Sequence, residues 1–290
     1  MIRLGTFTPS VLVRVARRTG RLAAAGLEVS EQAVPSSPGQ FAALLDGTLD
    51  AVLTSPDNVL AYRYTAANPL GRTADVRVLA AVDRGMGLAL YSRLTPPELR
   101  GRVFGVDVPA SGFAFAMYAL AESLGLGRDD YRVTALGSTP KRLAALLAAE
   151  CDATMLNAGN ELHAERAGVP ALARVSEVCR PYLGTVLAVL GDPREPQEAL
   201  AAMLAGTAAA VCGGELDSEV LAEAQDALGL DEPMAKRYLE RLRSPAEGLV
   251  PDGVVDLESV RTLVELRRRY GPATCDDPYA AAFVPGSGLL

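Results

Sequence analysis

The sequence feature that most constrains the fold is a repeat of short signals at a nearly constant offset of 100 to 102 residues. A glycine-led strand end, an Ala-Ala-Leu-Leu segment and an Asp-Ala pair followed by an Asn all occur twice. The paired positions are 5–10 with 105–111, 42–45 with 144–147, 50–51 with 152–153, and Asn58 with Asn160. A constant offset across strand, helix and loop signals indicates two lobes of one topology.

Strand and helix patterns alternate in both copies of the repeat. The first copy predicts strands at 2–7, 27–32 and 51–54, with helices at 10–25, 39–46 and 57–65. The second copy predicts strands at 102–108, 131–136 and 153–156, with helices at 111–124, 140–149 and 160–167. Such alternation is typical of an α/β fold in which each lobe is a mainly parallel sheet flanked by helices. The alternative is a chance likeness within a single α/β sheet.

Two segments, at 82–90 and 179–187, lead from a turn into a new apolar strand, and we interpret them as strands that pass between the lobes. They predict a hinge near 84–92 and 180–188. The first lobe then comprises residues 1–88 and 186–290, and the second comprises residues 89–185. After residue 190 the pattern is helical, and helices are expected at 197–211, 218–227, 232–242 and 257–270. We expect this run to pack on the first lobe and the tail from 277 to be irregular.

Composition narrows the classes of protein that this chain can be. The 290 residues are 49% hydrophobic, which excludes wholesale disorder, and the formal net charge of −7 disfavours a nucleic-acid partner. The longest apolar stretch, at 200–212, is too short for a transmembrane segment. The four cysteines are widely spaced, which indicates free thiols and no metal cluster; they are Cys151, Cys179, Cys212 and Cys275.

The N-terminus enters a predicted strand directly and shows no signal peptide. As the sequence stands, this predicts a cytoplasmic protein. If a leader was removed, the protein is extracytoplasmic.

Ligands of open α/β sheets bind beyond the carboxyl ends of the strands, where helices begin. Each predicted lobe has two such loops, at 8–10 and 55–58 in the first lobe and at 109–112 and 157–160 in the second. Unpaired N–H groups at helix starts suit an anionic group. We therefore expect the loops to share a cleft for a small ligand, either anionic or heteroaromatic. For any single Ser or Asp, helix capping alone is the alternative.

The expected ligand-binding side chains come from these loops and from the crossing segments. Those expected to hydrogen-bond the ligand are Thr8, Ser10, Ser55, Asp57, Asn58, Ser111, Asn157 and Asn160. Arg84 can reach into the cleft from the first crossing and bind a carboxylate or sulfonate. The apolar walls are expected from Met86, Phe113 and Tyr182. No cofactor or metal is expected.

These motifs make the chain resemble the type 2 periplasmic binding proteins. More closely, it resembles their nitrate/sulfonate/taurine-binding group, which includes thiamine-pyrimidine synthase-like proteins. The resemblance rests on residues 8–10, 50–52, 55–58, 99–103, 108–113 and 152–157. It implies a cleft that closes on a small solute and delivers the solute to the permease of an ABC transporter.

Some members of that group are cytoplasmic enzymes, and a lyase, cyclase or hydrolase on the same fold is the alternative function. The Cys nucleophile of the sulfinate desulfinases and the His and Cys-rich motif of the pyrimidine synthases have no counterpart here. The single histidine, His163, is expected to face solvent. Catalysis would therefore depend on carboxylates, with Asp57 and Asp107 as the candidates and Asp83 as a further one. A ligand-sensing regulatory domain is a third possibility.

Overall fold

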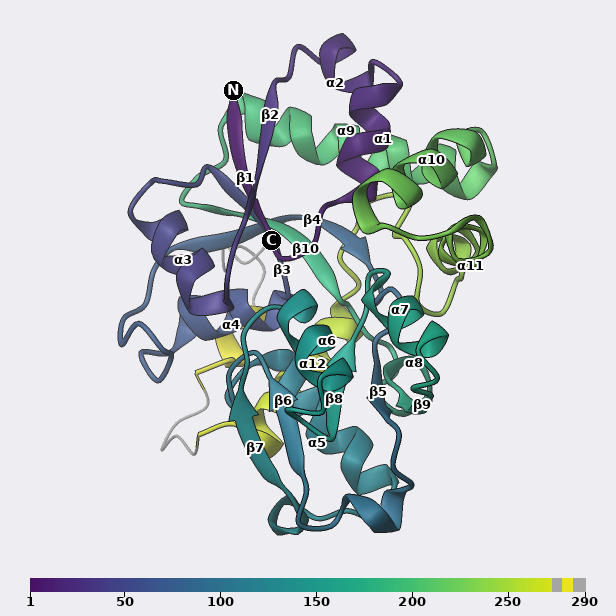
Figure 1. The fold of residues 1–290 in the computed structure, drawn as a ribbon. Helices are drawn as coiled ribbons and strands as arrows, with labels where there is room; N and C mark the ends of the chain where they lie inside the picture. Colours follow the sequence, from purple (N-terminus) through teal and green to yellow (C-terminus); the bar gives the residue numbers. More distant parts are fainter. Residues whose placement is uncertain (273–277, 284–290) are drawn as a thin grey trace.

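The computed structural model describes residues 1–272 and 278–283, and it contains two five-stranded sheets, one above the other in Figure 1. The first sheet consists of β1 (Ile2–Thr6), β2 (Val29–Ala33), β3 (Ala51–Thr54), β4 (Val76–Asp83) and β10 (Thr185–Leu190). The second consists of β5 (Ala89–Ser92), β6 (Val103–Val106), β7 (Arg132–Ala135), β8 (Ala153–Leu156) and β9 (Ala171–Arg174). The alternative of a single continuous sheet is therefore wrong.

The two sheets have the same strand order. The first runs β2-β1-β3-β10-β4 and the second runs β7-β6-β8-β5-β9. The three strands from each repeat pair in parallel, as expected. The fourth strand of each order, β10 or β5, is antiparallel to both of its neighbours, so each sheet is mixed. The structure thus confirms an α/β fold with two equivalent sheets.

The repeated glycine and aspartate have the same structural role in both sheets. Gly5 pairs with Val52 of β3, and Gly105 pairs with Thr154 of β8. The Asp50 carboxylate accepts a hydrogen bond from the Arg3 backbone N–H (2.9 Å), and Asp152 accepts one from Val103 (2.8 Å). The repeat detected in the sequence therefore records equivalent strand contacts.

Helices flank both sheets. Those of the two repeats are α1 (Val11–Arg18), α2 (Arg21–Ala24), α3 (Ser37–Leu45), α4 (Pro56–Tyr64), α5 (Gly112–Ser123), α6 (Thr139–Leu147), α7 (Asn160–Arg166) and α8 (Val175–Val178). Short 3₁₀ turns cover Pro96–Leu99, Arg128–Asp130 and Ala280–Phe283. The single helix expected at 10–25 is interrupted because Gly20 has a φ of +74°, a left-handed conformation that ends α1 and precedes α2.

The C-terminal helices are α9 (Glu195–Gly213), α10 (Asp217–Leu228), α11 (Glu232–Arg243) and α12 (Leu257–Tyr270). As expected, α9 and α10 pack on α1 of the first sheet's half. Helix α12 differs, because it packs against α4 of the first half and also against α5 of the second. For α12, the expected packing on the first half is present, and the packing on the second half is an additional contact.

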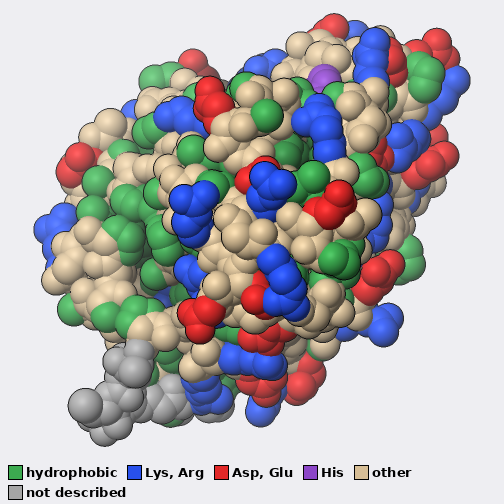
Figure 2. Space-filling model, turned by 60° about the horizontal axis from the view of Figure 1, so that its bottom comes forward, with side chains coloured by type: hydrophobic (Ala, Val, Ile, Leu, Met, Phe, Trp, Pro, Cys, Tyr) green, Lys and Arg blue, Asp and Glu red, His purple; other side chains and the backbone are tan. Residues whose placement is uncertain are grey.

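No single helix of the described residues has the length and apolarity needed to cross a membrane; α9 and α10 reach them only as a pair bent by 111°. Cys151, Cys179 and Cys212 are free thiols, and the first two are buried. Cys275 and most of the tail from 277 lie outside the described residues. Figure 2 shows Lys/Arg and Asp/Glu side chains interspersed over one face of the molecule.

The two connecting segments pass each other closely at Gly184. Its N–H donates to the Asp83 carbonyl (2.9 Å), and a Cβ added at Gly184 would lie 2.5 Å from Gly85 Cα. Gly184→Ala is therefore expected to lower the free energy of unfolding by about 1–3 kcal/mol, measured by denaturant titration. The control is Gly206→Ala in α9, where a Cβ meets nothing within 4 Å. That change is expected to stabilise by roughly 0.5–1 kcal/mol, and equal effects of the two changes would contradict the steric argument.

Candidate functional site

A cavity of about 130 Å³ lies between the two sheets. An apolar cavity of about 150 Å³ can hold benzene, so this volume suits a small organic ligand of similar size. Its walls come from the loops that follow β1 and β3 in the first sheet and β6, β7 and β8 in the second. The carboxyl ends of strands from both sheets therefore meet at one site, as expected for ligands of open α/β sheets.

Eight of the predicted ligand-binding residues line this cavity. They are Thr8, Ser10, Ser55, Asn58, Met86, Ser111, Phe113 and Asn157. Asp107, one of the two candidate catalytic carboxylates, also lines it. The remaining four predicted residues, Asp57, Arg84, Asn160 and Tyr182, are placed elsewhere.

Two of the lining serines also cap helices. Ser10 Oγ accepts a hydrogen bond from Val13 N (3.3 Å), and Ser111 Oγ accepts one from Ala114 N (3.4 Å). Capping and lining are therefore combined in the same side chains. Ser55 differs, because it makes no side-chain cap bond and its buried Oγ has no hydrogen-bond partner among the described residues.

The asparagines join the two halves next to the cavity. Asn160 Nδ2 donates to Thr8 Oγ1 across the halves (3.2 Å) and to the Asn157 carbonyl (3.1 Å). Asn157 Nδ2 donates to the Gly85 carbonyl (3.3 Å). Asn160 thus positions Thr8 and does not itself line the cavity.

Asp57 is fully buried in an ion pair and is not part of the cavity wall. Its Oδ1 accepts from Arg267 Nε (2.6 Å) and its Oδ2 accepts from Arg267 Nη2 (3.1 Å). Arg267 Nη2 also donates to the Ala110 carbonyl of the second half (3.4 Å). Gly112 packs so closely that a Cβ there would lie 2.7 Å from Asp57 Cγ. Asp57 therefore joins α4, α12 and the start of α5, and its expected contact with the ligand is a contact with Arg267 instead.

The other two predicted residues lie in the crossing segments, away from the cavity lining. Arg84 Nη1 donates to the Leu249 carbonyl (2.6 Å), so the guanidinium holds the chain that follows α11. Tyr182 is buried, and its hydroxyl has no hydrogen-bond partner among the described residues. His163 is only partly exposed and its Nε2 lies 2.8 Å from the Leu228 carbonyl, so the expectation of a solvent-facing ring is wrong.

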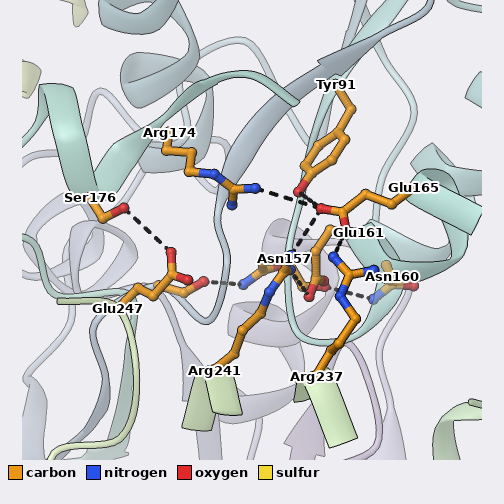
Figure 3. A network of polar contacts seen from close by, with 11 residues as sticks. Tyr91, Asn157, Asn160, Glu161, Glu165, Arg174, Ser176, Arg237, Arg241 and Glu247 are labelled. Atoms are coloured by element: carbon orange, nitrogen blue, oxygen red, sulfur yellow. Dashed lines mark hydrogen bonds and ion pairs between the residues drawn. The ribbon is translucent and has the colours of Figure 1, made fainter. Parts of the chain in front are cut away.

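A second polar network joins α11 to α7 near the cavity (Figure 3). Arg241 pairs with Glu161 and, at 2.9 Å, with Glu165. Arg237 also pairs with Glu165. Burial raises the pKa of Glu161 to about 7, although the Arg241 charge opposes that shift. Helices α11 and α12 thus each hold the second half through a buried arginine.

The charged residue that sequence reasoning missed is Arg142 in α6. It lines the cavity with only 2% of its surface exposed. Its Nη1 donates to the Gly137 carbonyl (2.6 Å) and its Nη2 to Thr139 Oγ1 (3.0 Å). Burial lowers the pKa of Arg142 to about 10, so the guanidinium is still charged at neutral pH. The repeat offset of 102 could have found it, because it aligns Arg142 with the buried Gln40.

Asp83, at the end of β4, is the third charged residue of the cavity lining. Its Oδ1 accepts from the Gly85 backbone N–H (2.8 Å). Burial raises the pKa of Asp83 to about 6. The sequence indicated Asp83 only as a candidate acid or base. Among the described residues, no group of three or more His, Cys, Asp or Glu side chains is placed to hold a metal ion.

No protein-family model and no curated protein matches the sequence of the chain. Several solved structures match its fold. The alkanesulfonate-binding protein SsuA from Xanthomonas axonopodis is 16% identical with a TM-score of 0.71, and 94% of each chain is covered. The periplasmic nitrate-binding protein NrtA from Synechocystis is 12% identical with a TM-score of 0.73, covering 96% of this chain and 83% of that one.

A third match is a Candida albicans protein described as having the generic periplasmic binding protein fold. It is 14% identical with a TM-score of 0.71, covering 96% of this chain and 92% of that one. The chain has the periplasmic-binding-protein fold. The fold implied by the sequence resemblance is therefore confirmed. In this fold, the cavity described above lies between two sheets of one topology, and strand-end loops from both sheets line it.

Proposed function

We propose that the chain is the solute-binding component of an ABC-type uptake system and binds a small molecule in the cavity between its sheets. The observation that carries this proposal is the cavity lined by strand-end loops of both halves. The names of the matched sulfonate- and nitrate-binding proteins support the same role. The partners are then a small-molecule ligand and a transporter permease.

The proposal requires the halves to separate so that the ligand can enter. We infer lobes of residues 1–88 with 186–290 and of residues 89–185, which move about a hinge near 84–92 and 180–188. Two contacts support a closed arrangement: Ser138 N donates to the Pro35 carbonyl (3.1 Å) and Ser37 N donates to Asp107 Oδ2 (3.1 Å). Both join residues of different lobes and lie beside the cavity.

An extracytoplasmic location follows from this role, with a leader removed from the native protein. The matched NrtA is described as periplasmic, which supports this location. Reading the native gene upstream of Met1 for an earlier start tests it.

The function is tested by native mass spectrometry of the full chain purified from its own host, with the co-purified small molecule identified and added back. At 100 times its dissociation constant, the ligand is expected to raise the free energy of unfolding by about 2.7 kcal/mol. Small-angle X-ray scattering is expected to show a smaller radius of gyration with the ligand. Chemical conversion of the ligand during incubation would instead favour an enzyme.

A variant with a partly filled cavity provides the matched control. Ser138 is buried and lines the cavity, whereas Ser123 is exposed near the end of α5. Ser138→Leu is expected to abolish the ligand-induced change in radius, and Ser123→Leu is expected to keep it. Retained binding by the first variant would contradict the location of the site.

A further inference from the structure

The two repeats allow the buried charge at Arg142 to be compared with a neutral residue in the same structural position. Gln40 and Arg142 are separated by 102 residues, as are Leu53 and Met155. Gln40 Nε2 donates to the Leu53 carbonyl (3.0 Å), and Arg142 Nε donates to the Met155 carbonyl (3.3 Å). Because an amide satisfies the equivalent carbonyl, packing at this position does not require a positive charge.

Asp107 is the second charge that only one repeat carries. At the offset of 100 it corresponds to Phe7, which also lines the cavity. Asp107 is only 9% exposed, and its Oδ2 accepts from Ser37 N. Its Oδ1 is buried and has no hydrogen-bond partner among the described residues. An unpaired buried carboxylate oxygen is unfavourable unless a donor from outside the chain reaches it.

The other charges of the cavity also favour a hydrogen-bond donor next to Asp107 Oδ1. Among the described lining residues, the charged side chains are Asp83, Asp107 and Arg142, so the wall has a net charge of −1. Arg142 forms no ion pair with a described carboxylate, and its charge attracts Asp107 at longer range. Ser55 Oγ is a further buried polar atom of the wall that has no hydrogen-bond partner in the described part of the chain.

We propose that the ligand is a compound with N–H donors and no net negative charge, such as an amine, an amidine or an amino-substituted heterocycle, which donates to Asp107 Oδ1. This inference rests on the proposed solute-binding function. This ligand class excludes the anionic ligand, which the N–H groups at the helix starts alone would favour. One of those starts already faces a carboxylate of the chain, because Ser37 at the beginning of α3 donates to Asp107.

The test compares ligands of the same shape and opposite charge on the full chain. Calorimetry measures the dissociation constants for binding to the protein. Benzamidine is compared with benzoate, and guanidinium is compared with nitrate. We expect each cation to bind more tightly than its anion. Asp107→Asn keeps the acceptor for Ser37 N and is expected to weaken benzamidine binding at least about tenfold. Arg142→Gln installs the residue of the first repeat and is expected to strengthen it.

Asp129→Asn, at an exposed position, is the matched control and is expected to leave the constants unchanged. Circular dichroism and the unfolding midpoint of each variant confirm that it is folded. Tighter binding of the anions, or weaker benzamidine binding in Arg142→Gln, would overturn the proposed ligand class and leave the solute-binding function standing. If neither these probes nor any co-purified molecule binds, the solute-binding function itself fails.

Discussion

Arg267→Met is expected to lower the free energy of unfolding by about 3–5 kcal/mol. Among the described residues, the substitution removes the only ion-pair partner of Asp57, whose side chain is 1% exposed. It also removes the donors to the Ala110 carbonyl and the Tyr279 hydroxyl. The loss is large because a carboxylate without its partner is strongly disfavoured in the interior. Chemical denaturation at pH 7, with circular dichroism as the readout, measures it.

The double variant Arg267→Met with Asp57→Leu provides the decisive control. Replacing both charges by apolar groups leaves no unpaired ion, so much of the lost stability is expected to return. Glu232→Gln, which breaks the exposed pair with Lys236, is expected to leave the free energy of unfolding nearly unchanged. A double variant as unstable as the single one would show that the loss arises from packing and not from an uncompensated charge.

Asp83→Asn is expected to change the stability of the unliganded protein by an amount that depends on pH. Burial raises the pKa of Asp83 to about 6 from an ordinary value of 3.8, so the folded state binds a proton more readily than the unfolded state does. Stability from this group is therefore present below about pH 4 and is lost as the pH rises through about 6. The shift corresponds to about 3 kcal/mol between pH 4 and pH 8, and the variant does not incur that loss.

The charged and titratable neighbours of Asp83 do not reverse this pH dependence of stability. Arg84 is the nearby cation, and its charge lowers the pKa of Asp83 less than burial raises it. Burial also holds the pKa of Tyr182 and Tyr238 well above neutrality, so neither titrates in this range. Denaturant titrations of the wild type and the variant at pH 4.5, 6 and 8 test the prediction. A stability difference that does not change with pH would contradict it. Asp152→Asn, immediately before β8, provides a comparison away from the cavity.

The fold could be predicted largely because the repeat is local and periodic. Signals such as Asp50-Ala51 and Asp152-Ala153 recur at a constant offset and mark equivalent strand contacts in the two sheets. Helix starts were equally readable, since Ser10 and Ser111 cap helices at the positions expected. Eight of the residues predicted from the strand-end loops and from the crossing segments line one cavity.

The errors arise where long-range packing decides the role of a side chain. Arg267, Arg268 and Arg269 form one basic helix end in the sequence, yet Arg267 is buried against Asp57, 210 residues away. The helical period places Arg267 on the buried face with Val260, Leu263 and Val264, but it does not identify the distant partner. Asp57 was assigned to the ligand for the same reason. The sequence around a carboxylate at a helix start does not show whether a distant residue pairs with it. Arg142 was missed because arginines are abundant throughout the chain.

Helix α12 has a consequence for how quickly a ligand is exchanged. It packs against both α4 and α5. Arg267 contacts the Asp57 carboxylate of the first half and the Ala110 carbonyl of the second. If the lobes part as proposed, the Ala110 contact has to break while the pair with Asp57 stays together. Opening of the lobes would then require this contact of α12 to break, in addition to the movement of the two connecting strands. The contact would set the residence time of the bound molecule, although α12 does not touch that molecule.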